Sequence, residues 1–119
     1  MKIVKIGDVP RKQSESPLFE GGNVYAQPLI GTDLTEELRV TVMNFNTGAV
    51  TKFHTHDFEQ ILYVISGKGR VATESEEHTV LPGTIIFIPK GENHLHGATN
   101  DSPFVQLTIM RPGTTDFKK

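Results

Sequence analysis

The chain has 119 residues, 36% of them hydrophobic and 22% charged, a length that fits one domain with its own core. Its 12 basic and 14 acidic residues give a net charge of −2 without any basic block, which argues against nucleic acid as the main partner. Cysteine is absent, so disulfides, thiolate nucleophiles and thiolate-bound zinc are excluded.

The first part of the chain is a polar segment broken by prolines and glycines. We expect it to form an arm that packs along the rest of the protein or onto a partner subunit. It has no apolar run typical of a signal peptide, and the longest apolar stretch of the chain, Ile61–Ile65, is far shorter than the ~20 residues of a membrane span. We therefore expect a cytoplasmic protein without membrane contact. The expected organisation is an N-terminal arm at 1–23, a barrel at 24–112 and a C-terminal tail at 113–119.

Short segments rich in β-branched and aromatic residues follow the arm and are separated by turns such as Pro82-Gly83. Many short strands at this spacing predict an all-β sandwich or barrel. The one helical candidate is Thr32–Leu38, where a capped turn or two could form. The expected strands are Val24–Ile30, Leu38–Asn46, Val50–His56, Gln60–Ser66, Gly69–Thr73, His78–Leu81, Thr84–Ile88, His94–Ala98 and Phe104–Met110.

Two expected strands are apolar at consecutive positions, at Ile61–Ile65 and Ile85–Ile88. Such runs are typical of strands that are buried on both faces. One face would line the core, and the arm or a second subunit would cover the other and protect the sheet. The sequence therefore predicts a homodimer.

Four of the five histidines form two His-x-His pairs, His54 with His56 and His94 with His96. Side chains at i and i+2 of a strand share a face, so each pair presents two imidazoles on one side. A single His-x-His pair often occurs by chance, with both rings at the surface. Two pairs, each flanked by apolar residues, favour a cluster of histidines in the interior. We interpret His54, His56 and His94 as metal ligands or catalytic groups, whereas His96 is a ligand, a general base or a neighbour of a ligand. His78 lies in a polar hairpin and is expected at the surface.

A fourth ligand would come from the segment after His56, where Asp57, Glu59 and Gln60 are candidates. Charge favours Glu59, because a carboxylate is the usual anionic ligand. Strand parity favours Gln60, which lies at an even offset from both histidines.

The spacing of these residues resembles the two motifs of the cupin superfamily. Gly48 to Gly67 reads G-x5-H-x-H-x3-Q-x6-G, with Gln60 in the place of the usual Glu. Gly83 to His94 reads G-x5-P-x-G-x2-H, although Ala98 stands where the second motif has Asn. The flanking segments are similar to small single-domain cupins associated with carboxymuconolactone decarboxylase, which typically carry Gln as a ligand and His-Trp-His-Gly-Ala. Leu95 replaces that Trp here, which alters the wall of the pocket.

This resemblance implies an antiparallel double-stranded β-helix, the jelly-roll or cupin barrel, with little or no helix. It also implies one divalent metal ion per chain, held by His54, His56, Gln60 and His94. Ni, Mn, Fe, Co, Cu and Zn all accept histidine, so the identity of the ion stays open. Because the four ligands are uncharged, the site keeps the full charge of the ion and favours an anionic chelating substrate.

His96 is the candidate general acid or base beside this site. We expect a metal-dependent enzyme that acts on a small oxygen-rich organic acid by proton transfer or C–C cleavage, as a decarboxylase, isomerase or lyase. The alternatives are an Fe- or Mn-dependent dioxygenase and a non-catalytic sensor that binds a small molecule or a metal. A packed or solvated role is the simpler interpretation of two of the candidate substrate contacts, Tyr63 and Arg39. The full set of candidates is Tyr63, Arg39, Phe53, Phe87 and Met43.

Overall fold

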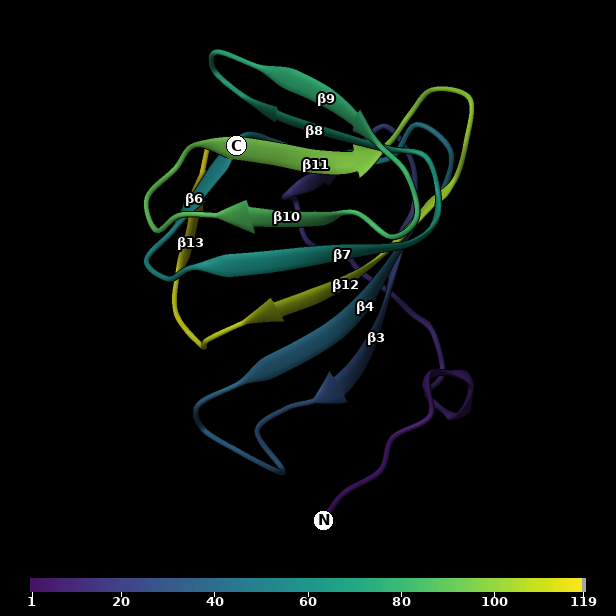
Figure 1. The fold of residues 1–119 in the computed structure, drawn as a ribbon, viewed down its shortest axis with the longest axis vertical. Coiled ribbons are helices and arrows are strands. Elements are labelled where there is room, and N and C mark those ends of the chain that lie inside the picture. The colour runs from purple at the N-terminus through teal and green to yellow at the C-terminus, as the bar shows by residue number, and fades with distance from the viewer. Residues whose placement is uncertain (119) are drawn as a thin grey trace.

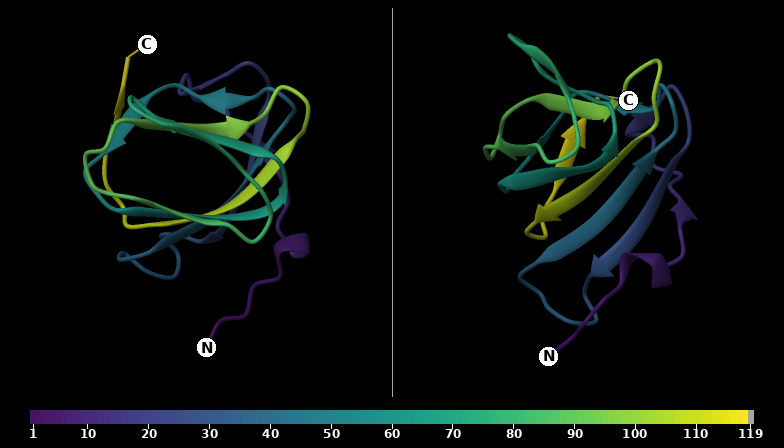
Figure 2. Two further views of the ribbon diagram at one scale, coloured as in Figure 1. Left: turned by 45° about the horizontal axis from the view of Figure 1, so that its top comes forward. Right: turned by 45° about the vertical axis from the view of Figure 1, so that its right-hand side comes forward.

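Two antiparallel sheets face each other across one core in the computed structural model, which describes residues 1–118 (Figure 1). The left view of Figure 2 looks into the barrel that the sheets enclose. The strands of the first sheet, in spatial order, are β1 (Lys12–Gln13), β3 (Val24–Ile30), β4 (Arg39–Phe45), β12 (Phe104–Met110), β7 (Gln60–Gly67) and β10 (Ile85–Ile88). In the second sheet they are β13 (Thr115–Phe117), β6 (His54–His56), β11 (His94–Ala98), β5 (Val50–Thr51) and β2 (Phe19–Glu20), with the hairpin of β8 (Gly69–Thr73) and β9 (Glu77–Val80) joined to β11.

The all-β architecture expected from the sequence is confirmed, and several strands have the predicted bounds. The expected strand Val50–His56 is divided into β5 and β6. The helical prediction for Thr32–Leu38 is wrong. This segment forms turns, in which the Gly31 carbonyl accepts hydrogen bonds from the N–H groups of Leu34 and Thr35. Within residues 1–118 the only helical element is the short 3-10 turn η1 (Ile6–Asp8).

The core forms because side chains alternate between the two faces of each strand. Along β7, Gln60, Leu62 and Val64 are buried, whereas the residues between them point outward. Gly69 lies against the ring of Phe104, which occupies the space that a Cβ atom would need. The buried core cluster consists of Val24, Phe45, Ala49, Val64, Val80, Ala98 and Phe104.

Both ends of the chain add strands to the sheets. In the arm, β1 pairs with β3 and β2 pairs with β5. The amide of Gln27 donates hydrogen bonds to the carbonyls of Ile6 (3.2 Å) and Val9 (2.9 Å), so the arm covers the outer face of β3. The expected tail at 113–119 contains β13, which pairs with the histidine strand β6; Lys119 lies outside the described residues.

No helix within residues 1–118 has the length and apolar character that crossing a membrane requires.

Candidate metal centre

Strand pairing brings three histidines together inside the barrel. β6 and β11 are neighbours, and their register sets His54 opposite His94. The rings of these two residues are 4.2 Å apart between centroids, and the ring of His56 is 4.8 Å from His54 and 5.3 Å from His94. One ligand nitrogen from each of the three residues lies within 4.8 Å of the others, and all three side chains are buried. This arrangement is that of a three-histidine metal site.

Backbone carbonyls orient two of these rings. The Nδ1 atom of His54 is 2.8 Å from the carbonyl oxygen of Lys52, and that of His94 is 2.8 Å from the carbonyl oxygen of Glu92. A carbonyl only accepts, so each Nδ1 carries the proton and each Nε2 keeps its lone pair. The Nε2 atoms of His56 and His94 are buried without a hydrogen-bond partner. Unpartnered ring nitrogens that lie this close together can bind a cation.

Gln60 reaches the same space from β7 in the opposite sheet. Its side chain is 4% exposed, and its Nε2 group donates to the sulfur of Met110 at 3.8 Å. The amide oxygen of Gln60 is left buried and unpartnered, as a ligand oxygen would be before it meets a metal. Asp57 and Glu59 point outward, and Asp57 accepts a hydrogen bond from the Thr114 N–H at 2.8 Å. Of the three candidates for a fourth ligand, the structure brings only Gln60 inside.

The ring of His56 is held by the C-terminal segment. Its Nδ1 atom is 2.9 Å from the hydroxyl of Thr115 on β13, and its face stacks on Phe58 with centroids 4.5 Å apart. The sequence analysis missed Thr115 because the segment was expected to be a tail. A sequence signal for it exists in the short alternating run Thr115–Phe117, which pairs with β6.

All four interior histidines are neutral in the barrel. Burial, and after it the neighbouring His94, together lower the pKa of His54 and of His56 from 6.5 to about 4. Burial also lowers the pKa of His94, against the opposing effect of the Glu92 carbonyl, and holds that of His96 well below 6.5. Neutral imidazole is the form that binds metal, so these rings need not lose a proton first.

His96 lies beside the three-histidine group on the same inner face of β11. Its ring is 5.5 Å from that of His54 and 5.9 Å from that of His94, and Phe45 packs edge-on against it. The backbone N–H of His96 donates to the hydroxyl of Thr51, while its side-chain Nδ1 is buried without a partner. His96 is therefore a polar neighbour of the centre with a free ring nitrogen. The fifth histidine, His78, is exposed and bonded to Glu76.

The remaining candidate residues are divided between the two faces of the first sheet. Met43 packs against the core, and Arg39 shares the inner side of β4 by register, where its guanidinium donates to the carbonyls of Thr35 and Leu38. Tyr63 and Phe87 lie on the outer face, 39% and 55% exposed, because they alternate with the inward residues.

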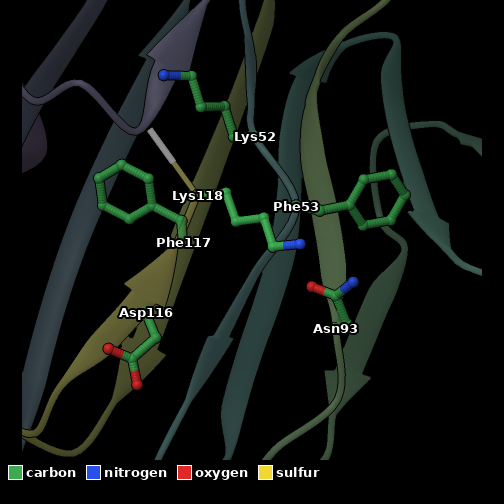
Figure 3. Close-up of a pocket in the computed structure, with 6 residues that line it drawn as sticks. All are labelled: Lys52, Phe53, Asn93, Asp116, Phe117 and Lys118. Atoms are coloured by element: carbon green, nitrogen blue, oxygen red, sulfur yellow. The ribbon is translucent and has the colours of Figure 1, made fainter.

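Phe53 lies outside the second sheet, in the hollow of about 470 Å³ drawn in Figure 3. Lys52 and Phe117 line the same hollow, with the Lys52 ammonium 5.9 Å from the centroid of the Phe117 ring. The structure does not bring Tyr63 or Phe53 to the histidines, whereas Phe87 lines a small cavity that His94 also lines.

A smaller cavity of about 90 Å³ lies between β10 and the β8–β9 hairpin. Its wall includes His94, together with the apolar side chains of Ile86, Ile88 and Leu95. Glu76 and Glu92 contribute carboxylates to its lining. This cavity reaches the histidine cluster at His94.

Comparison with known proteins agrees with this fold and site. A family model described as "Cupin domain" matches residues 41–110, more than half of the chain, and the chain belongs to the cupin family. It is 28% identical over 111 residues to the (R)-mandelonitrile lyase of Granulicella tundricola, which covers 92% of this chain and 84% of that protein. A cupin-like protein from Thermotoga maritima is 28% identical with a TM-score of 0.82, covering 89% of this chain and 83% of that chain. The polyketide cyclase RemF from Streptomyces resistomycificus is 25% identical with a TM-score of 0.84, covering 100% and 87%.

The first prediction concerns the pH dependence of the metal-free protein. The interior histidines have a folded-state pKa below the unfolded value of 6.5, so the unfolded chain binds more protons as pH falls. Their contribution to stability is complete above pH 6.5 and is lost as pH falls toward about 4. We expect the Tm of metal-free protein to fall by several degrees between pH 7.5 and pH 5. A Tm that stays constant over this range, measured by circular dichroism, would contradict neutral burial.

The second prediction concerns the hydrogen bond between Thr115 and His56. The substitution Thr115→Val keeps the shape of the side chain but removes the oxygen that orients the His56 ring. We expect metal affinity to fall about 10- to 100-fold, measured by competition with a chromophoric chelator. Thr55→Val is the matched control, because Thr55 lies on the outer side of the same strand. Equal metal affinities for the two variants would exclude this role for Thr115.

Proposed function

We propose that the protein is a metal-dependent enzyme that acts on a small oxygen-rich organic molecule by proton transfer or C–C cleavage. The observation that carries the proposal is the set of buried and unpartnered acceptors that converge from both sheets. Two imidazole nitrogens and one amide oxygen in this set have no protein partner. Unsatisfied acceptors of this kind are unfavourable in a protein core, so a ligand-binding role explains them better than packing does.

The family relationships support the reaction class. A relative that matches 92% of this chain is named as a lyase of (R)-mandelonitrile, a small α-hydroxy compound. The similar structure of RemF is that of a polyketide cyclase. For this chain we propose a reaction in which a proton moves next to a polarised oxygen on a small molecule.

In this proposal His54, His56, His94 and Gln60 hold one divalent cation, whose identity among Ni, Mn, Fe, Co, Cu and Zn is open. The cation supplies Lewis acidity toward substrate oxygens. The chain supplies the proton acceptor, because the buried and neutral His96 has a free Nδ1 atom beside the centre. The apolar wall of Leu95, Ile86 and Ile88 limits the size of the substrate and keeps water from the proton-transfer step.

The third prediction tests this chemistry directly. Protein loaded with each candidate ion should cleave (R)-mandelonitrile or exchange solvent deuterium into the position next to the carbonyl of a small keto acid. Both reactions are followed by NMR. Removing the metal with a chelator should abolish the reaction. The substitution His96→Asn should lower kcat about 100- to 10,000-fold, because the proton acceptor is lost, while metal content stays at one ion per chain.

Arg70→Gln is the control, since this exposed side chain is bonded to Glu77 and does not line the cavity that His94 lines. Running the assays without oxygen separates this proposal from an oxygenase, whose turnover would stop. Ligand binding without turnover under all these conditions would favour a sensor and would sink the enzymatic proposal.

We further propose that the protein is a homodimer formed through the outer face of β7, β10 and β12. Ile61, Tyr63 and Ile65 are 37–39% exposed on β7, and Ile85 and Phe87 are 65% and 55% exposed on β10. The register sets Ile85 opposite Tyr63 and Phe87 opposite Ile61, and Leu107 and Ile109 extend the surface on β12. The outward side chains of these three strands are uncharged, and charged residues border them at one end, where Asp57, Glu59, Lys90 and Arg111 line a hollow with Ile61, Phe87 and Ile109. The arm lies at the other end, near Ile65 and Val105. A second copy of the same patch fits the part between them.

The fourth prediction follows from this interface. Phe87→Glu adds a charge to the patch on its edge strand β10 and should convert the dimer to a monomer, measured by light scattering after gel filtration. Phe53→Glu is the control, because Phe53 is 40% exposed on the other sheet and should leave the dimer intact. A monomeric mass for the unmodified protein would defeat the proposal.

A further inference from the structure

A second group of buried polar side chains lies on the inner face of the barrel, next to His96. Gln106 and Thr108 occupy neighbouring inward positions on β12, where they are 0% and 5% exposed. Gln106 lies close to the His96 ring, which projects from the opposite sheet. The sequence shows the pair as two polar residues at the inward positions of an otherwise apolar strand.

The hydrogen bonds inside this group leave one strong acceptor free. The Nε2 group of Gln106 donates to the hydroxyl of Thr108 at 3.0 Å, which fixes the orientation of the amide. The Oε1 atom of Gln106 is buried and makes no hydrogen bond, although the His96 ring lies within reach of the Gln106 side chain. A buried amide oxygen of this kind calls for a donor, and an entering ligand can supply one or displace a water that does.

The surroundings of this acceptor are uncharged. Register sets Gln106 beside Val64 on one side and Met43 on the other, and Phe45 packs against the neighbouring His96. Arg39, on the inner side of β4, lies opposite Met110 at the other end of β12 and is bonded to two loop carbonyls. A second anionic group would therefore find no counter-ion next to Gln106, whereas a neutral hydroxyl would find its acceptor.

We infer that Gln106, held by Thr108, forms a hydroxyl-binding subsite that selects hydroxy acids with one carboxylate and a further neutral hydroxyl. This inference rests on the proposed function, in which the carboxylate end of the substrate lies at the metal centre. The distal hydroxyl donates to Oε1 of Gln106 and leaves Nδ1 of His96 free for the proton transfer. Gln106 is then a specificity-determining residue.

The test compares glycerate with lactate, two acids that share the α-hydroxy carboxylate and differ by one distal hydroxyl. Protein loaded with one equivalent of Co(II) is titrated with each acid by calorimetry, and the visible spectrum of the ion reports contact with the carboxylate end. We expect glycerate to bind roughly three- to tenfold more tightly than lactate. In Gln106→Met, which has a similar volume and no acceptor, glycerate should bind as weakly as lactate, and the lactate affinity should be unchanged.

Thermal unfolding of the metal-free variants separates binding from a structural role. Gln106→Met removes the unpartnered amide oxygen together with the buried hydrogen bond to Thr108, whereas Thr108→Val removes that hydrogen bond and leaves the amide in place. Gln106→Met should therefore have a Tm equal to or above that of Thr108→Val. A lower Tm for Gln106→Met than for Thr108→Val would overturn the inference, as would equal affinities of the unmodified protein for the two acids. If neither acid perturbs the Co(II) spectrum although the ion is bound, the chelation in the proposed function fails, and the Tm comparison still tests the subsite.

Discussion

The arrangement of this protein depends on one constraint: neutral imidazoles are buried with their lone pairs directed into a common space. Three histidine nitrogens within 4.8 Å of one another cannot all be protonated in a low-dielectric interior. Backbone carbonyls of Lys52 and Glu92 hold the protons on the far side of two rings. The same geometry that keeps the rings uncharged also enables them to bind a metal ion, so the electrostatics of the site and its capacity for metal binding have one origin.

The supporting residues come from parts of the chain that lie far apart in sequence. Thr115 holds His56 from the last strand, and Met110 holds the amide of Gln60 from the strand before it. Each of these contacts orients a polar side chain without adding charge. The centre therefore depends on closure of the barrel by β12 and β13, and the C-terminal segment is part of the site.

The interior has polar groups on one side of the histidine cluster and an apolar wall on the other. His96, Gln106 and Thr108 are buried together, whereas Ile86, Ile88 and Leu95 line the cavity that reaches His94. Buried polar atoms without partners reduce the stability of a core, and proteins retain them where a ligand uses them. In the proposed function, this division would orient a small substrate between the cation and the amide of Gln106.

The sequence alone determined the all-β architecture, because alternation within short segments and the Gly and Pro turns between them are local properties. It also determined the shared face of each His-x-His pair and the inward parity of Gln60, since a strand has a period of two. Only the tertiary structure decided which residues meet across the barrel. Thr115 meets His56 because β13 pairs with β6, two strands far apart in sequence. Gln106 meets His96 across the barrel, from the opposite sheet. Both contacts depend on long-range strand register. The consecutive apolar residues at 61–65 and 85–88 predicted strands buried on both faces, but Tyr63 and Phe87 lie on the exposed outer face. In a strand that is apolar on both faces, the sequence does not show which face packs against the core.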